Sequence, residues 1–205
     1  MNIILENIGK RFNTEWIFRR LNYQFEAGKK YAITGPNGSG KSTLLQIISG
    51  ATTHNEGTIN FNENGQPIIA EKIYSKISLA APYLELIEEM TLSEFIIFHG
   101  KMKGWVDNFH SDQIIESVHL AKATHKQIRY FSSGMKQRVK LGQAIFSDTT
   151  VILLDEPLTN LDEEGISLYH SLIDKYCNKR TVIVSSNDKK EYSFSDEVLD
   201  INAYK

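Results

Sequence analysis

The chain has 205 residues, 41% hydrophobic and 23% charged, a composition that suits one globular domain over residues 1–205. A net charge of −2 gives no strong positive field, so no nucleic acid is expected as a partner. Cys177 is the one cysteine, which excludes a disulfide framework within the chain and fits a reducing compartment. No apolar run approaches the roughly 20 residues that span a bilayer, and residues 1–12 predict a first strand rather than a signal peptide.

The first functional pattern in chain order is a glycine-rich segment behind a short apolar run. Residues 31–34 predict a buried strand, and residues 35–43 read GPNGSGKST, which fits the phosphate-loop pattern G-x-x-x-x-G-K-[ST]. Lys41 is placed to approach the β- and γ-phosphates, and Ser42 offers a hydroxyl to Mg²⁺. A helix predicted from Thr43 adds its N-terminal dipole, and a chance lysine in a turn would not need this strand–loop–helix order. The residues expected to bind the nucleotide here are Gly35, Pro36, Asn37, Gly38, Ser39, Gly40, Lys41, Ser42 and Thr43.

Three helices are predicted in the following hundred residues. Thr91-Leu-Ser-Glu94 is a capping-box pattern, and Gly104 is expected to end the helix that starts there. A second helix is predicted over residues 111–123. Ser132 is expected to cap a third helix that continues through Ile145. The basic residues on this helix are expected to form a solvated face: Lys136, Arg138 and Lys140.

A second functional pattern begins with the continuous apolar run of residues 151–154, which predicts a parallel strand buried on both faces. Asp155 and Glu156 follow at its carboxyl end, where open α/β sheets bind ligands. Asp155 is expected to support Mg²⁺ together with Ser42, and Glu156 is expected to be the general base toward an attacking water. Alone, an Asp-Glu pair could equally be a solvated turn. Together with the glycine-rich loop, it indicates a P-loop nucleoside triphosphatase.

The segment between these two patterns reads FSSGMKQR at residues 131–138, and TNLD follows at residues 159–162. In this order the motifs resemble those of the ATP-binding-cassette (ABC) ATPases. Segments 56–59 and 194–201 match family strands as well, so the resemblance covers nearly the whole chain. It implies an α/β fold with a mostly parallel core sheet, an N-terminal antiparallel β part and a helical insertion at roughly residues 83–147.

The resemblance also implies ATP and Mg²⁺ as cofactors, and ATP hydrolysis by a head-to-tail dimer. In such a dimer the signature residues Ser132, Ser133 and Gly134 cover the γ-phosphate bound by the other subunit. Asp162 contacts the partner subunit near its phosphate loop, and Phe12 sits where the family stacks an aromatic ring on adenine. The sequence leaves two arrangements open, a second ABC subunit that is identical to this chain and one that is different.

The leading functional hypothesis is the ATPase subunit of a membrane transporter with a separate transmembrane permease subunit. This places the chain in the cytoplasm, peripheral at the inner face of the cell membrane. The alternatives are a soluble ABC ATPase for assembly or remodelling, and a nucleotide-gated module with weak hydrolysis. In family transporters a groove receives a short helix of the membrane subunit. Residues that could line such a groove, or simply pack, are Pro82, Tyr83, Leu84, Leu86 and Ile87.

Two residues depart from the family pattern. The family has a glutamine after the strand that resembles residues 76–81, and here Tyr83 or Glu85 could take its place. The family has a histidine after the strand at residues 181–184, and here Asn187 stands at that position. Asparagine can donate a hydrogen bond to phosphate, but it carries no charge and relays no proton. Hydrolysis is therefore expected to be slow, with Asn187 still counted among the catalytic residues.

Overall fold

The computed structural model describes residues 1–205, except for the side chain of Ala70. The strands are β1 (Asn2–Phe12), β2 (Glu15–Phe25), β3 (Lys30–Thr34), β4 (Glu56–Glu63), β5 (Gln66–Pro67), β6 (Ile77–Ala80), β7 (Val151–Asp155), β8 (Thr181–Ser185) and β9 (Glu197–Asp200). The α-helices are α1 (Lys41–Ile48), α2 (Leu92–Lys103), α3 (Ser111–Ser117), α4 (Ser133–Phe146) and α5 (Glu163–Tyr176). Short 3₁₀ helices are η1 (Ala70–Ser75), η2 (Val106–Asn108), η3 (Ala121–Ala123), η4 (Ile128–Tyr130), η5 (Lys189–Glu191) and η6 (Ile201–Tyr204).

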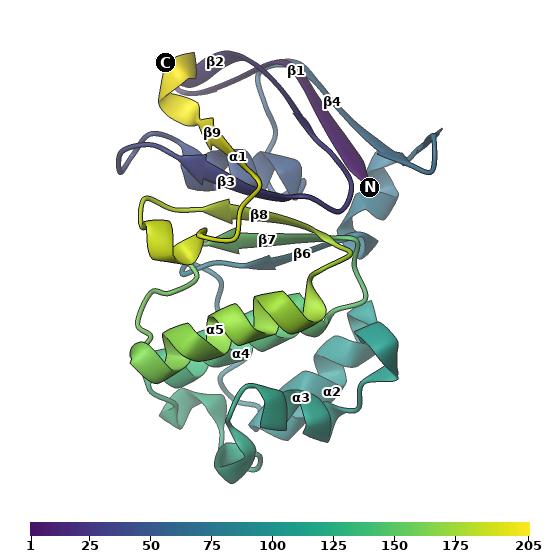
Figure 1. Cartoon of the computed structure of the whole chain (residues 1–205), viewed down its shortest axis with the longest axis vertical. Helices are drawn as coiled ribbons and strands as arrows, with labels where there is room; N and C mark the ends of the chain where they lie inside the picture. The colour runs from purple at the N-terminus through teal and green to yellow at the C-terminus, as the bar shows by residue number, and fades with distance from the viewer.

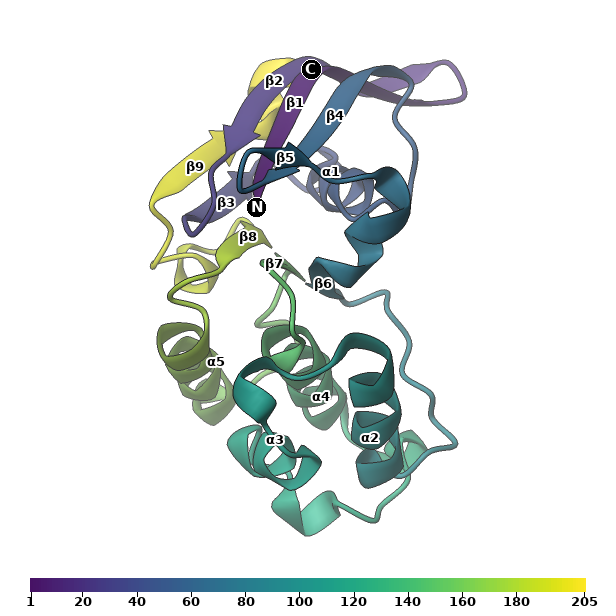
Figure 2. The same cartoon turned by 90° about the vertical axis from the view of Figure 1, so that its right-hand side faces the viewer.

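These strands form two sheets. An antiparallel sheet has the strand order β2-β1-β4-β5, and a parallel sheet has the order β6-β7-β8-β3-β9. The parallel sheet lies in the middle of the molecule, with α1 and the antiparallel sheet on one side and the helices α4 and α5 on the other (Figure 1). The view from the side shows α2 and α3 in the same helical layer, next to α4 (Figure 2). The expected α/β architecture, with its antiparallel N-terminal part, is confirmed.

The central strands are buried on both faces, which explains their unbroken apolar sequence. In β7, Val151 and Leu153 belong to the core shared with α1 and the antiparallel sheet, whereas Ile152 and Leu154 belong to the core shared with the helices. Because successive side chains of a strand point to opposite faces, one run of apolar residues supplies two separate cores. The residues of β7 before Asp155 are therefore all apolar.

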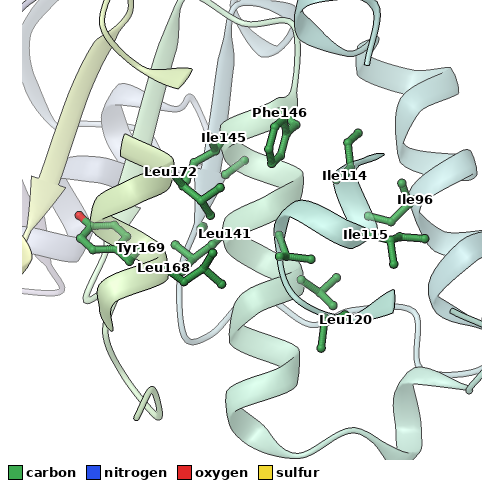
Figure 3. Packing of buried hydrophobic residues seen from close by; sticks show 14 of the residues in the cluster. Ile96, Ile114, Ile115, Leu120, Leu141, Ile145, Phe146, Leu168, Tyr169 and Leu172 are labelled. Atoms are coloured by element: carbon green, nitrogen blue, oxygen red, sulfur yellow. The ribbon is translucent and has the colours of Figure 1, made fainter. Parts of the chain in front are cut away.

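The helical layer is centred on α4. In Figure 3, Leu141 of α4 and Leu168 and Leu172 of α5 point toward one another on one side of α4. Ile114 and Ile115 of α3 lie on its other side, and all of these side chains are buried in one cluster. The apolar stripe of α4 thus meets two neighbours at once, which fixes the start of this helix relative to the parallel sheet.

The predicted start of α2 is confirmed in detail. The Thr91 hydroxyl accepts a hydrogen bond from the Glu94 N–H at 3.3 Å, and the Glu94 carboxylate accepts one from the Thr91 N–H at 2.8 Å. Gly104 ends the helix with a φ of 71°. Ser132 caps α4 as predicted, because its hydroxyl accepts the Met135 N–H at 3.2 Å. Across the described residues, no helix is long and apolar enough to cross a membrane.

The prediction of a helix over residues 111–123 is wrong about the position of its C-terminal end. Helix α3 stops at Ser117, because His119 takes a left-handed conformation with a φ of 57°. The Leu120 N–H then bonds back to the Ile115 carbonyl at 3.0 Å, and the His119 N–H bonds to the Glu116 carbonyl at 2.9 Å. This is the hydrogen-bond pattern with which glycine commonly ends helices. Here a histidine occupies the position, so no glycine marks the end in the sequence.

The basic residues of α4 do not form the solvated face expected of them. Lys136 pairs with Glu88. Arg138 keeps only 13% of its side chain exposed and pairs with Asp162 and Glu164. Lys140 donates to the carbonyl oxygen atoms of residues 81 and 82 at 3.2 and 2.8 Å. Their partners come from segments distant in the sequence, which pattern analysis of one helix cannot include.

Candidate functional site

The glycine-rich loop connects β3 to α1 at the carboxyl end of the parallel sheet. Gly38 has a φ of 75° and would meet nothing within 4 Å if it carried a Cβ, so it serves the backbone conformation. Gly40 has a φ of 102°, and a Cβ there would lie 2.4 Å from the Ile17 Cγ2 atom. No side chain caps α1, in contrast to α2, α4 and α5, so its first N–H groups face the loop without a capping acceptor. Such an uncapped helix start favours a bound anion.

Lys41 is held inside this loop. The residue is only 5% exposed, and its Nζ atom donates to the carbonyl oxygen atoms of Gly35 and Pro36 at 2.7 and 3.3 Å. Ser39 is also buried, and its hydroxyl oxygen atom has no hydrogen-bond partner among the described residues. The loop therefore presents a buried cation and an unpaired hydroxyl in one place, as a phosphate-binding loop requires.

Asp155 lies at the end of β7, opposite Ser185 of β8. It is only 2% exposed, and its Oδ1 atom has no hydrogen-bond partner in the part of the chain that the structure describes. Burial raises the pKa of the Asp155 carboxyl, while the nearby Ser42 and Ser185 side chains act in the opposite direction. A buried carboxylate with a free oxygen atom beside a serine hydroxyl fits Mg²⁺, which typically takes one or two carboxylates and the phosphates of its nucleotide.

Glu156 follows in an unusual backbone conformation, with a φ of 43°. Its N–H donates to the Ser185 carbonyl at 2.9 Å. The exposed Glu156 side chain lines a cavity of ≈ 350 Å³, together with Asn37 and Asn187. The two carboxylates of the predicted pair therefore face different surroundings, one buried at the predicted metal site and one accessible to water.

Asn187 connects the segment after β8 to the glycine-rich loop. Its Oδ1 atom accepts the Gly35 N–H at 3.1 Å, and its Nδ2 atom donates to the Asn37 Oδ1 atom at 3.2 Å. Asn187 therefore lies beside the glycine-rich loop. The contact uses both the acceptor and the donor of the amide, so Asn187 bonds to the loop as a neutral group.

The signature residues lie apart from the loop of the same chain. Ser132, Ser133 and Gly134 line a cavity of ≈ 470 Å³ that also includes Asp162. This cavity shares no lining residue with the cavity beside Glu156. Asp162 itself caps α5, because its Oδ1 atom accepts the Gly165 N–H at 2.8 Å. The structure therefore brings together the loop, Asp155, Glu156 and Asn187, but leaves the signature elsewhere.

Phe12 stands at the end of β1 and is 52% exposed, with the Lys10 Nζ atom 4.8 Å from its ring centre. An exposed aromatic face at this position is compatible with stacking on a base. Two further residues of the site were not found from the sequence, namely Gln137 and Glu191. Both are buried and both bond to the backbone of the turn after Glu156. The segment FSSGMKQR includes Gln137, but nothing in the sequence indicates its contact with this turn, and no motif includes Glu191.

The strand, glycine-rich loop and helix beside the carboxylates of β7 define the class of P-loop nucleoside triphosphatases. Residues 18–159 match the family model described as ABC transporter. The chain belongs to the ABC transporter family. Family membership supports ATP binding and ATP hydrolysis, normally with Mg²⁺.

Curated relatives agree with this assignment. The chain is 31% identical over 192 residues to the cytochrome c biogenesis ATP-binding export protein CcmA of Reclinomonas americana, covering 90% of this chain and 84% of the relative. It is 31% identical over 204 residues to the uncharacterized ABC transporter ATP-binding protein YybJ of Bacillus subtilis (strain 168), covering 96% and 90%. A putative ABC transporter ATP-binding protein from Pyrococcus furiosus has the same fold, with a TM-score of 0.82, 22% identity and 100% coverage of both chains.

Proposed function

We propose that the chain is the ATP-hydrolysing subunit of a membrane transporter whose membrane-spanning part is a separate polypeptide. The observation that carries the proposal is the buried Asp155 with its unpaired Oδ1 atom, beside the glycine-rich loop and Glu156. Relatives named as an export protein and as transporter ATP-binding proteins support the transport role.

In this proposal the glycine-rich loop binds the triphosphate. Lys41 neutralises charge on the β- and γ-phosphates, and the first N–H groups of α1 donate to them. Phe12 stacks on the base. Ser42 and Asp155 would hold Mg²⁺, which would neutralise part of the negative charge of the phosphates.

Glu156 then acts on water as the general base. It accepts a proton as the water oxygen atom bonds to the γ-phosphorus atom, and the bond from that atom to the ADP oxygen breaks. Asn187 donates a hydrogen bond toward the γ-phosphate but adds no charge. If that contact acts mainly in the transition state, hydrolysis is slower than with a histidine, by about one to a few powers of ten.

The separation of the signature from the loop supports a composite site. The cavity beside Ser132–Gly134 and the cavity beside Glu156 share no lining residue, which favours a nucleotide covered by the signature of another subunit. Two subunits packed head to tail would place each signature on the nucleotide of the other. ATP then favours the closed dimer, and hydrolysis releases it.

Exposed apolar side chains on η1 and α2 support a membrane partner. Tyr74, Ile97, Phe98 and Met102 are exposed, and a neighbouring cavity of ≈ 350 Å³ includes Leu84. An exposed apolar surface of this kind marks an interaction site. We place a short helix of the permease subunit here, which holds the chain at the inner face of the cell membrane.

Steady-state hydrolysis of Mg·ATP tests the proposal. Wild type is expected to turn over, Glu156→Gln to lose activity and to accumulate as an ATP-bound dimer in size-exclusion chromatography, and Asn187→His to turn over faster. Glu116→Gln is the matched control, because Glu116 is an exposed carboxylate on α3. Full activity of Glu156→Gln would refute the role of Glu156 as the base. An unchanged rate for Asn187→His would refute the assigned cause of slow turnover.

Asn187 also favours a second candidate, a nucleotide-gated module with little hydrolysis of its own. In that case the wild-type protein itself forms a long-lived dimer with ATP, and its turnover is negligible. The same chromatography and rate measurement distinguish the two functions, because only the transporter motor needs turnover to release the dimer.

A further inference from the structure

Two buried side chains hydrogen-bond to one peptide group just after Glu156, one side chain to its carbonyl and the other to its N–H. The Gln137 Nε2 atom donates to the Pro157 carbonyl oxygen atom at 2.8 Å. The Leu158 N–H donates to the Glu191 Oε1 atom at 2.8 Å. The Pro157 carbonyl and the Leu158 N–H belong to the same planar peptide unit, so these two bonds fix its orientation.

Both of these hydrogen-bonding residues are buried, with 3% of Gln137 and 5% of Glu191 exposed. Burying an amide or a carboxylate is costly unless hydrogen bonds compensate. Burial raises the pKa of the Glu191 carboxyl, while the Ser186 side chain and the Leu158 N–H lower it. Apolar residues could fill this space without that cost, so the polar contacts need an explanation beyond packing.

Glu191 is itself fixed in place. The hydroxyl of Tyr169, a fully buried residue of α5, donates to the Glu191 carbonyl at 2.7 Å. The Glu191 N–H donates to the Asp188 carbonyl at 2.9 Å, one residue after Asn187. The acceptor of the Leu158 N–H therefore belongs to a hydrogen-bonded segment that starts at Asn187.

The backbone on both sides of Glu156 is hydrogen-bonded. On its N-terminal side, Glu156 is tied to β8 through the bond from its N–H to the Ser185 carbonyl at 2.9 Å. Its φ of 43° is a conformation that residues other than glycine rarely keep without support. On its C-terminal side, the Glu156 carbonyl accepts the Thr159 N–H at 3.1 Å, and the Pro157–Leu158 peptide follows with its two buried bonds.

We propose that Gln137 and Glu191 are positioning residues that aim Glu156 through the Pro157–Leu158 peptide. The inference rests on the proposed function, in which Glu156 is the general base. Gln137 lies one turn into α4, the helix that begins at the signature, and Glu191 lies on the segment of Asn187. A shift of either element would rotate the same peptide and misdirect Glu156. The two contacts thus link the catalytic turn to both regions that approach the γ-phosphate.

The test uses variants that keep size but change hydrogen bonding. Glu191→Met and Gln137→Met remove one contact each, whereas Glu191→Gln keeps an acceptor for the Leu158 N–H. Ser78→Ala is the stability control, because it removes a buried bond to the Ala144 carbonyl at 2.7 Å that touches no part of this turn. The readouts are kcat and KM for Mg·ATP, and hydrogen exchange of the Leu158 amide by NMR.

Both methionine variants are expected to lower kcat about tenfold with KM nearly unchanged, since they misplace a base without touching the phosphate site. Glu191→Gln and Ser78→Ala should stay near wild type. Leu158 exchange should accelerate about tenfold in Glu191→Met but not in Glu191→Gln. Unchanged kcat in the methionine variants, or a Glu191→Gln variant as slow as Glu191→Met, would overturn the inference.

The failure of this inference differs from a failure of the proposed function. If Glu156→Gln is fully active, the proposed base is wrong, whatever Glu191 does. If wild type shows no turnover, hydrogen exchange of the Leu158 amide still tests the inference. Unchanged exchange in Glu191→Met would show that Glu191 does not hold this peptide, and faster exchange would support the contact.

Discussion

Replacing Gly40 by alanine tests whether the close approach of the phosphate loop to β2 fixes the nucleotide site. The new Cβ atom would lie 2.4 Å from the Ile17 Cγ2 atom and 3.0 Å from the Phe18 Cδ1 atom, at a φ of 102°. The positive φ costs about 1–2 kcal/mol, and the overpacking costs about 1–3 kcal/mol. Each 1 kcal/mol lowers the Tm of a chain of this length by about 2–4 °C. ATP affinity should fall as well, because a shifted Gly40 misplaces the first N–H groups of α1.

Gly50→Ala is the matched control, because Gly50 has a φ of 77° and a Cβ there would meet nothing within 4 Å. Circular-dichroism melts give the stability loss, and calorimetric titration gives the ATP affinity. Ile17→Ala removes the methyl group that clashes, so it should restore part of the stability in the Gly40→Ala background. Equal losses for Gly40→Ala and Gly50→Ala, or no restoration by Ile17→Ala, would refute the steric reasoning.

Two further predictions concern the helical layer. Burial lowers the pKa of His99 to about 4, and its ring bonds to the Ser147 hydroxyl at 2.8 Å. In the unfolded chain the His99 ring binds a proton at higher pH than in the folded protein. The contribution of neutral His99 to the free energy of unfolding is therefore complete above about pH 6.5 and is lost as pH falls through about 4. Thermal melts across this range should be flatter for His99→Gln, and identical slopes would contradict the assignment. Thr91→Ala should cost about 1 kcal/mol in urea unfolding by removing the cap, whereas the neighbouring Ser93→Ala should cost less; equal costs would count against the cap.

The fold was predictable where local sequence and tertiary environment demand the same residues. The central strands had to be apolar throughout because both of their faces are covered, and the run at residues 151–154 shows it directly. The end of α3 was not predictable in this way. His119 adopts the left-handed conformation that glycine would signal, and this choice depends on packing rather than on intrinsic preference.

The candidate site was predictable to the extent that its chemistry requires particular residues at fixed spacing. Lys41 and Asp155 belong to patterns that phosphate and metal binding impose, and the structure places both where the patterns predict. Gln137 and Glu191 belong to no such pattern. Their polar side chains lie in polar strings, and only the folded chain shows that they are buried against one peptide.

The two candidates for the missing glutamine lie in different surroundings. Burial raises the pKa of Tyr83, the Gln46 side chain lowers it and the charge of Asp155 raises it, so its hydroxyl is neutral. Glu85 lines another cavity together with Lys136 and Lys140. A carboxylate beside the phosphates would repel them, whereas a phenol can donate a hydrogen bond. Tyr83 and Asn187 would then both be neutral donors around the γ-phosphate. In the proposed function Lys41 would supply the charge there, and the rate would then depend all the more on the orientation of Glu156.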